Sequence, residues 1–286
     1  MFKLQKNFDD PTPNGIINQR LITHLSLITQ YVELSENEKK ALFDLLILIG
    51  KKLASVWLHY QKYASLEDQL IEEAEKKPIT SEQRVIKLEH SQELFFEFDE
   101  FLVQVKSCLD YLVKIPAIFI GPEKWGLRTF ASKGEDVIKA LQDNVPAPYK
   151  EKAKVAIDFI KNSHQWLGAT IKARDKINHF IDGGINFDYF TVCLIKDADK
   201  KQLRIPMWSN KQSIRSVMDV IWSNLFRLCE DLIGIFIWFR MKKGYAFFHD
   251  ASDDMDSVES PWKVKSKEQM DDIVRKGAWK EIELWE

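Results

Sequence analysis

One stretch of the chain, residues 149–181, constrains the fold most strongly, because a single glycine interrupts it. Pro148 stands just before the stretch, at a position where a first helical turn does not use the N–H that proline lacks. Gly183 and Gly184 follow it as a stop signal. The pattern predicts one long helix.

Apolar residues spaced three and four apart predict more helices at 16–34, 35–77, 80–115 and 209–243, with a short one at 132–143. Ser35 and Glu38 form a capping-box signature at the start of the second helix. Pro78 and Pro116 are expected to end the helices that precede them. We therefore predict a mainly α fold, an antiparallel helical bundle.

Two segments have the composition of strands. Residues 187–195 are rich in aromatic and β-branched side chains, and 202–208 are again extended after a polar turn, so a small β-hairpin insertion is predicted near 186–208. The expected domains are an N-terminal helix packed on the bundle (1–34), the bundle itself (35–244), and an acidic linker with a C-terminal tail (245–286). Three tryptophans in the tail predict that it docks: Trp262, Trp279 and Trp285.

Composition narrows the class of protein. The longest apolar runs fall far short of the roughly 20 residues that span a bilayer, and the N-terminus lacks the apolar core of a signal peptide. The cysteines, Cys108, Cys193 and Cys229, are odd in number and widely spaced, which fits a reducing cytoplasm and neither a disulfide framework nor a zinc site. We expect a cytoplasmic protein without metal, cofactor or membrane contact.

The end of the predicted long helix carries the side chains that could act in catalysis. Asp175 and His179 are four positions apart, as are Arg174 and Asn178, so each pair shares a helix face. A carboxylate on one ring nitrogen fixes the tautomer of a histidine and supports its protonated form. Arg174 and His179 lie about 140° apart around an ideal helix at roughly 100° per residue. A two-fold homodimer is expected to bring the second copy that such a site needs.

This Arg-x4-His arrangement, with a polar residue directly after the arginine and late in a long helix, resembles the HEPN family. The resemblance implies an all-helical domain, metal-independent cleavage of RNA, a site assembled across a dimer, and a toxin or phage-defence role beside an antitoxin. It also implies that a polar residue from another helix joins the site, for which Asp99 and Asp110 are the candidates. Lys172 and Lys176 are the candidate RNA-binding cations, because residues 149–181 hold seven Lys or Arg against three acids.

The leading hypothesis is therefore an endoribonuclease in which His179 transfers the proton and Arg174 stabilises the transition-state charge. Asp175 would orient His179, and Asn178 would bond a ribose or phosphate oxygen. The alternative is a non-catalytic helical module that binds a nucleotide or a partner protein, because the net charge of −2 does not draw in nucleic acid. A metal-dependent hydrolase ranks last, because Glu89-His90 and His164 stand apart from other ligands.

Overall fold

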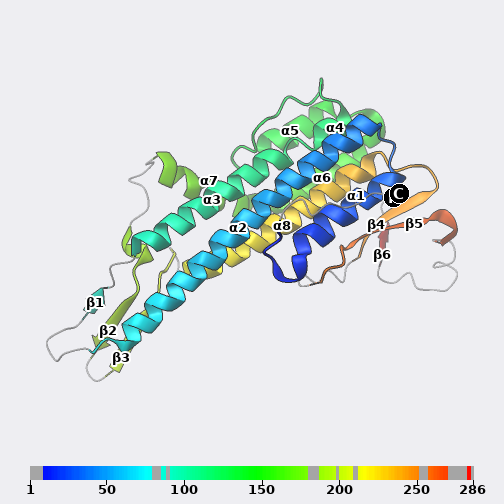
Figure 1. Cartoon of the computed structure of the whole chain (residues 1–286). Coiled ribbons are helices and arrows are strands. Elements are labelled where there is room, and N and C mark those ends of the chain that lie inside the picture. Colours follow the sequence, from blue (N-terminus) through cyan, green and yellow to red (C-terminus); the bar gives the residue numbers. More distant parts are fainter. Residues whose placement is uncertain are drawn as a thin grey trace. The chain divides into compact units, whose positions relative to one another are not determined.

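The computed structural model describes residues 9–78, 85–87, 91–179, 187–197, 200–208, 212–250, 257–269 and 282–284. Helices make up most of these residues, and the strands form two small antiparallel sheets (Figure 1). The predicted fold class, mainly α with a small β-hairpin insertion, is confirmed. None of the described helices is long and apolar enough to cross a bilayer.

The chain divides into two compact units that alternate along the sequence. Unit 1 comprises residues 1–54, 107–168 and 226–286, and unit 2 comprises 55–106 and 169–225. Four helices contribute residues to both units: α2 (Glu36–Lys76), α3 (Ser91–Leu112), α7 (His164–His179) and α8 (Ile214–Phe239). The units are thus assembled from distant parts of the sequence. The predicted division into 1–34, 35–244 and 245–286 stays a prediction.

The second half of α8 is buried within unit 1. From Leu232 to Phe239 its side chains are buried, which agrees with a helix that is apolar nearly all round. Gly234 provides the space for a large neighbour, because a Cβ at this position would lie 2.5 Å from Cε2 of Trp262. The indole of Trp262 itself is buried. The predicted docking of the C-terminal tail is therefore confirmed for Trp262, while 279 and 285 lie outside the described residues.

Unit 1 begins with a run of short helical segments, η1 (Pro13–Gly15), η2 (Ile17–His24), α1 (Leu25–Ile28) and η3 (Thr29–Tyr31), where one helix was predicted over 16–34. The backbone of η2 is π-helical, a form that is rare in proteins. The start of α2 follows the prediction. Ser35 N donates to Glu38 Oε2 across 2.7 Å, and Glu38 N donates to Ser35 Oγ across 3.3 Å, so the capping box is formed.

The helix predicted over 149–181 is two helices, α6 (Lys150–Asn162) and α7, preceded by η4 (Ala147–Tyr149). The break falls at Ser163. Its hydroxyl donates to the carbonyl of Phe159 across 3.0 Å, and its N–H is shared between the carbonyls of Phe159 and Ile160. A serine hydroxyl that bonds to the carbonyl four residues earlier perturbs the regular helical ladder, and periodicity alone does not reveal this effect.

The helix predicted from residue 80 is shorter. Its first part contains strand β1 (Val85–Lys87), and α3 begins only at Ser91. The β-branched pair Val85 and Ile86 meets Ile195 and Leu194 of a strand more than a hundred positions later, and this long-range pairing overrides the local helical pattern. Pro116 does not simply end a helix; it occupies the first turn of α4 (Pro116–Ile120), where its missing N–H is not needed.

The predicted hairpin is present in unit 2, with its strands shifted. β2 (Cys193–Asp197) and β3 (Lys200–Arg204) pair antiparallel, and β2 lies between β1 and β3. The first four residues assigned to the hairpin instead form a 3-10 turn, η6 (Phe187–Phe190). Phe190 is fully buried against Phe95 and Phe98. Packing of one aromatic ring into this cluster thus takes the place of strand pairing.

Strands also occur in the segment described from sequence as a linker and tail. β4 (Tyr245–Asp250) pairs with β5 (Trp262–Ser266) on one side and with β6 (Ile282–Leu284) on the other (Figure 1).

Two further predictions concern other segments. Between α4 and α6, α5 (Glu135–Asn144) agrees with the short helix predicted at 132–143. The acidic positions 253, 254 and 256 lie outside the described residues.

Candidate functional site

The predicted arginine lies on α7, in its part that belongs to unit 2. Arg174 Nη1 donates to Asp175 Oδ1 across 3.0 Å, and the Arg174 side chain is 28% exposed. The hydrogen bond joins neighbouring residues, so Asp175 holds the guanidinium close to its own turn of the helix. Part of the Arg174 side chain stays open to solvent, as a residue that binds a phosphate requires.

Asp99 of α3 lies within electrostatic reach of Arg174. Burial raises the pKa of the Asp99 carboxyl and Glu100 adds to this rise, while the positive charge of Arg174 opposes it. Asp99 Oδ1 and Arg174 Nε are both buried and lack a hydrogen-bond partner in the described part of the chain. Polar atoms of this kind are uncommon in folded proteins and point to a group that is completed by something else.

Asp110, the other predicted candidate from the same helix, has a different role. Its Oδ1 accepts a hydrogen bond from the backbone N–H of Phe130 across 2.7 Å. Asp110 and Phe130 belong to unit 1, whereas Arg174 belongs to unit 2. Asp110 therefore fixes the loop that precedes α5, and Asp99 is the candidate that the structure couples to Arg174.

The remaining predicted residues are described only in part. Lys172 is exposed and Lys176 is half-buried on α7. Asn178 and His179 belong to the last turn of α7, but their side chains lie outside the described residues. The predicted contacts from Asp175 to His179 and from Arg174 to Asn178 therefore stay predictions. The described bond of Asp175 is the one to Arg174.

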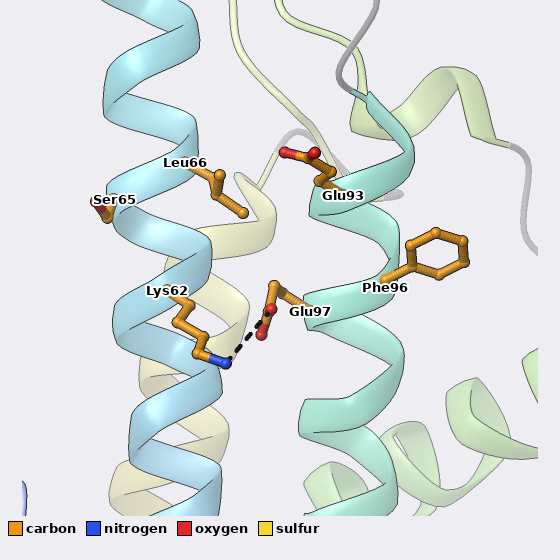
Figure 2. A pocket seen from close by; sticks show the side chains of 6 residues that line it. All are labelled: Lys62, Ser65, Leu66, Glu93, Phe96 and Glu97. Carbon is orange, nitrogen blue, oxygen red and sulfur yellow. Dashed lines mark ion pairs between the residues drawn. The ribbon is translucent and has the colours of Figure 1, made fainter.

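Unit 2 also contains an oriented histidine outside the predicted site. His59 Nδ1 on α2 and Glu97 Oε2 on α3 are 2.6 Å apart. Glu97 Oε1 lies 3.9 Å from Lys62 Nζ (Figure 2). Spacing along the chain does not reveal this arrangement, because His59 and Glu97 are 38 positions apart and meet only when α2 packs against α3.

A pocket opens beside this group. Its volume is about 430 Å³, within the range of small-molecule sites in proteins. α2 contributes Lys62, Ser65 and Leu66, and α3 contributes Glu93, Phe96 and Glu97. In Figure 2, Lys62 and Leu66 extend toward α3, and Glu97 extends toward α2. The two walls thus present opposite charges with apolar surface between them.

A second polar group of unit 2 is buried within the helices. Glu67 is 2% exposed, and its Oε1 has no hydrogen-bond partner among the described residues, nor does the hydroxyl of the buried Tyr63. Burial raises the pKa of Glu67 to about 7, the charge of Asp68 adds to the rise, and Arg215 opposes it. Arg215 Nη1 lies 3.7 Å from Glu67 Oε2 and 2.7 Å from Asp68 Oδ1. A carboxyl with such a pKa changes charge near neutral pH.

Comparison with other proteins adds no constraint on these sites. No protein-family model, no curated protein and no solved structure matches this chain. Among the described residues, no group of three or more His, Cys, Asp and Glu side chains is arranged to hold a metal ion. Function is therefore inferred from the geometry of unit 2 and from the Arg-x4-His motif.

Proposed function

We propose that the protein is a metal-independent endoribonuclease, with its site at the C-terminal end of α7. The observation that carries the proposal is the electrostatic coupling of Arg174 to Asp99, in which each partner keeps a buried polar atom without a hydrogen bond among the described residues. A guanidinium held from one side by Asp175 and not saturated on the other has donors left for a phosphate.

The proposed reaction needs no cofactor. The 2′-oxygen of a ribose attacks the adjacent phosphorus, a new P–O bond forms, and the bond from phosphorus to the 5′-oxygen breaks. His179 takes the proton from the 2′-hydroxyl, and the 5′-oxygen leaves after gaining a proton from an acid. The products end in a 2′,3′-cyclic phosphate and a 5′-hydroxyl. A histidine with a reference pKa near ~6.5 suits this proton transfer at neutral pH.

The other residues support the charged groups. Arg174 stabilises the negative charge that grows on the non-bridging oxygens, Asp175 positions Arg174, and Asp99 supports it from α3. Positions 174 and 179 are about 140° apart around an ideal helix, so a homodimer brings the second α7, and its His179 protonates the leaving oxygen. By the HEPN resemblance, the enzyme acts in the cytoplasm as a toxin or phage-defence effector controlled by an antitoxin.

The test uses purified protein and assorted RNAs, with and without a chelator. The wild type is expected to cleave equally well in both conditions. Arg174→Ala and His179→Ala are expected to abolish cleavage and to leave the melting temperature unchanged. Lys154→Ala is a matched control, because this exposed α6 lysine pairs only with Glu151 among the described groups. Full cleavage by either site variant, or products without cyclic phosphate ends, would contradict the proposal.

One observation favours the alternative of a non-catalytic module that binds a nucleotide or a partner protein. Two carboxyl groups, Asp99 and Asp175, act on the Arg174 charge and offset it. Salt distinguishes the two functions. RNA binding weakens steeply as salt is added, because phosphate contacts release counterions, whereas a protein interface with an apolar centre responds little.

A further inference from the structure

The pocket of unit 2 offers the chemistry that recognises one edge of a nucleobase. Its lining combines two carboxylates, one ammonium, a hydroxyl and two apolar side chains. This lining does not suit a phosphate, because Glu93 and Glu97 outnumber Lys62. It does suit a neutral, flat, polar group that has N–H donors for a carboxylate and an oxygen acceptor for the ammonium.

The two carboxylates differ in what they already bind. Glu97 is held by His59 at 2.6 Å and by Lys62 at 3.9 Å. Glu93 is exposed and has no partner in the parts of the chain that the structure describes. Both lie on α3, one turn apart, on the wall that faces Lys62 (Figure 2). Glu93 therefore has both oxygens available to a ligand, while Glu97 keeps Lys62 at the pocket.

Both helices contribute an apolar side chain to the lining. Leu66 extends from α2 toward α3, and Phe96, which is 57% exposed, extends from α3 on the side away from α2 (Figure 2). A phenylalanine this exposed beside a pocket is a surface that a ligand can cover. Unpaired bases of RNA are commonly bound by contact of their flat faces with such side chains and by hydrogen bonds to their edges.

We propose that this pocket binds guanine. The N1–H and the 2-amino group of guanine are adjacent donors that match the two oxygens of Glu93, and O6 beside them accepts from Lys62. Adenine offers one amino donor and a ring-nitrogen acceptor at this edge, so Glu93 would keep one hydrogen bond in place of two. A site built on hydrogen bonds discriminates strongly against a ligand that lacks them.

The biological role of this pocket rests on the proposed function: in an endoribonuclease, it would select RNA with an unpaired guanine near the cleaved bond. Binding of the base itself does not depend on cleavage. A free guanine nucleotide and a guanine within RNA present the same edge, and the experiment separates these two sources.

The first measurement is titration calorimetry of the full chain with 5′-GMP, 5′-IMP and 5′-AMP. GMP is expected to bind at least about tenfold more tightly than AMP, with IMP between them, because IMP lacks only the 2-amino group. Glu93→Gln is expected to remove this preference. The matched control is Glu73→Gln, an exposed glutamate on α2 outside the pocket lining. Equal affinity for GMP and AMP, or an unchanged preference in Glu93→Gln, would overturn the proposal.

The second measurement separates this proposal from the proposed function. Single-stranded RNAs with one guanine or none are given to the wild type, to Glu93→Gln and to Arg174→Ala. We expect Arg174→Ala to keep the GMP preference and lose cleavage, and Glu93→Gln to cleave the RNA with a guanine no faster than the RNA without one. Cleavage without any guanine dependence would refute selection of guanine in RNA and leave the nuclease assignment standing. A GMP preference without cleavage of any RNA would refute the nuclease assignment and identify free guanine nucleotide as the ligand.

Discussion

Arg20 and Glu230 form a two-point ion pair inside unit 1, with Arg20 Nη2 donating to Glu230 Oε2 across 2.6 Å and Arg20 Nε donating to Oε1 across 3.2 Å. Arg20 is 0% exposed and Glu230 is 1% exposed. The Arg20 guanidinium also lies over the ring of Phe226 and donates to the carbonyl of Ser257. The pair thus joins the π-helical segment η2 to α8 and to the segment that leads into β5.

This pair predicts an asymmetry between single and double substitutions. Glu230→Gln leaves a buried guanidinium without its counter-charge, so we expect a loss of about 3 to 5 kcal/mol in the free energy of unfolding. The double variant Arg20→Met, Glu230→Leu removes both charges and should lose much less. Urea unfolding of the wild type, of each single variant and of the double variant measures this. A double variant as unstable as the sum of the single variants would contradict the interpretation.

Gly234 predicts how the C-terminal sheet is attached. In Gly234→Ala, the new methyl group would meet the indole of Trp262, so we expect a loss of about 1 to 3 kcal/mol from overpacking and a shift of tryptophan fluorescence to longer wavelength. Gly126→Ala is the control, because a methyl group at this position would have no neighbour within 4 Å and the φ of Gly126 is not left-handed. Equal stability of both variants would show that Trp262 moves aside freely.

His24 predicts a loss of stability in acid. Burial lowers the pKa of His24, the charges of Lys263 and Arg20 add to this, and the hydrogen bond to the Trp262 carbonyl and the charge of Glu259 oppose it. The folded state therefore binds the proton less well than the unfolded chain. The contribution of neutral His24 to the free energy of unfolding is fully present above pH 6.5. It is lost as the pH falls through the lower pKa of His24 in the folded state.

His24→Gln keeps an N–H donor for the carbonyl of Trp262 and removes the titration. Its unfolding free energy, measured in urea between pH 8 and pH 5, should fall less in acid than that of the wild type. Parallel curves for the two proteins would mean that His24 contributes nothing to the pH dependence.

Glu67 of unit 2 predicts the opposite dependence of stability on pH. Its pKa of about 7 lies above the ordinary value of 4.5, because burial disfavours the carboxylate. The contribution of the protonated Glu67 carboxyl to the free energy of unfolding is full below pH 4.5 and is lost as the pH rises through about 7. Glu67→Gln should therefore be more stable than the wild type at pH 8, by on the order of 1 to 3 kcal/mol.

The control for Glu67 is Asp68→Asn, which removes the closer and more exposed partner of Arg215. We expect Asp68→Asn to keep the loss of stability between pH 4.5 and pH 8. Chemical denaturation at several pH values measures both variants. A stabilised Asp68→Asn with an unchanged Glu67→Gln would show that the titrating carboxyl is that of Asp68.

Asp99 and Asp110 predict different consequences from the same substitution. Asp99→Asn removes the charge that supports Arg174 and should reduce RNA cleavage at least about tenfold with a small change in stability. Asp110→Asn weakens the bond to the Phe130 N–H, so it should cost about 1 kcal/mol in stability and leave cleavage intact. Cleavage assays and thermal melting of both variants measure this. The reverse result would move the site from α7 to the loop after α4.

Local features of the sequence predicted the elements that depend on local physics. The capping box at Ser35 and Glu38 lies within one helical turn, so the residue types determine the helix start. The helical spacing of apolar residues in α2, α3 and α8 and the hairpin of β2 and β3 also depend on neighbours along the chain. Two wrong predictions fell where distant contacts decide: strand β1 exists because β2 pairs with it, and Phe190 turns inward because Phe95 and Phe98 receive its ring.

The candidate site follows the same division. Arg174 and Asp175 were predictable as a group because they are adjacent on α7, and the sequence alone determined that their helix ends in an Arg-x4-His pattern. Only the tertiary structure decided that Asp99 acts on Arg174 while Asp110 serves Phe130, and that Glu97 holds His59 beside a pocket. The physical reason is that the rotation of α3 sets which of its carboxylates meets which neighbour, and packing between helices sets that rotation.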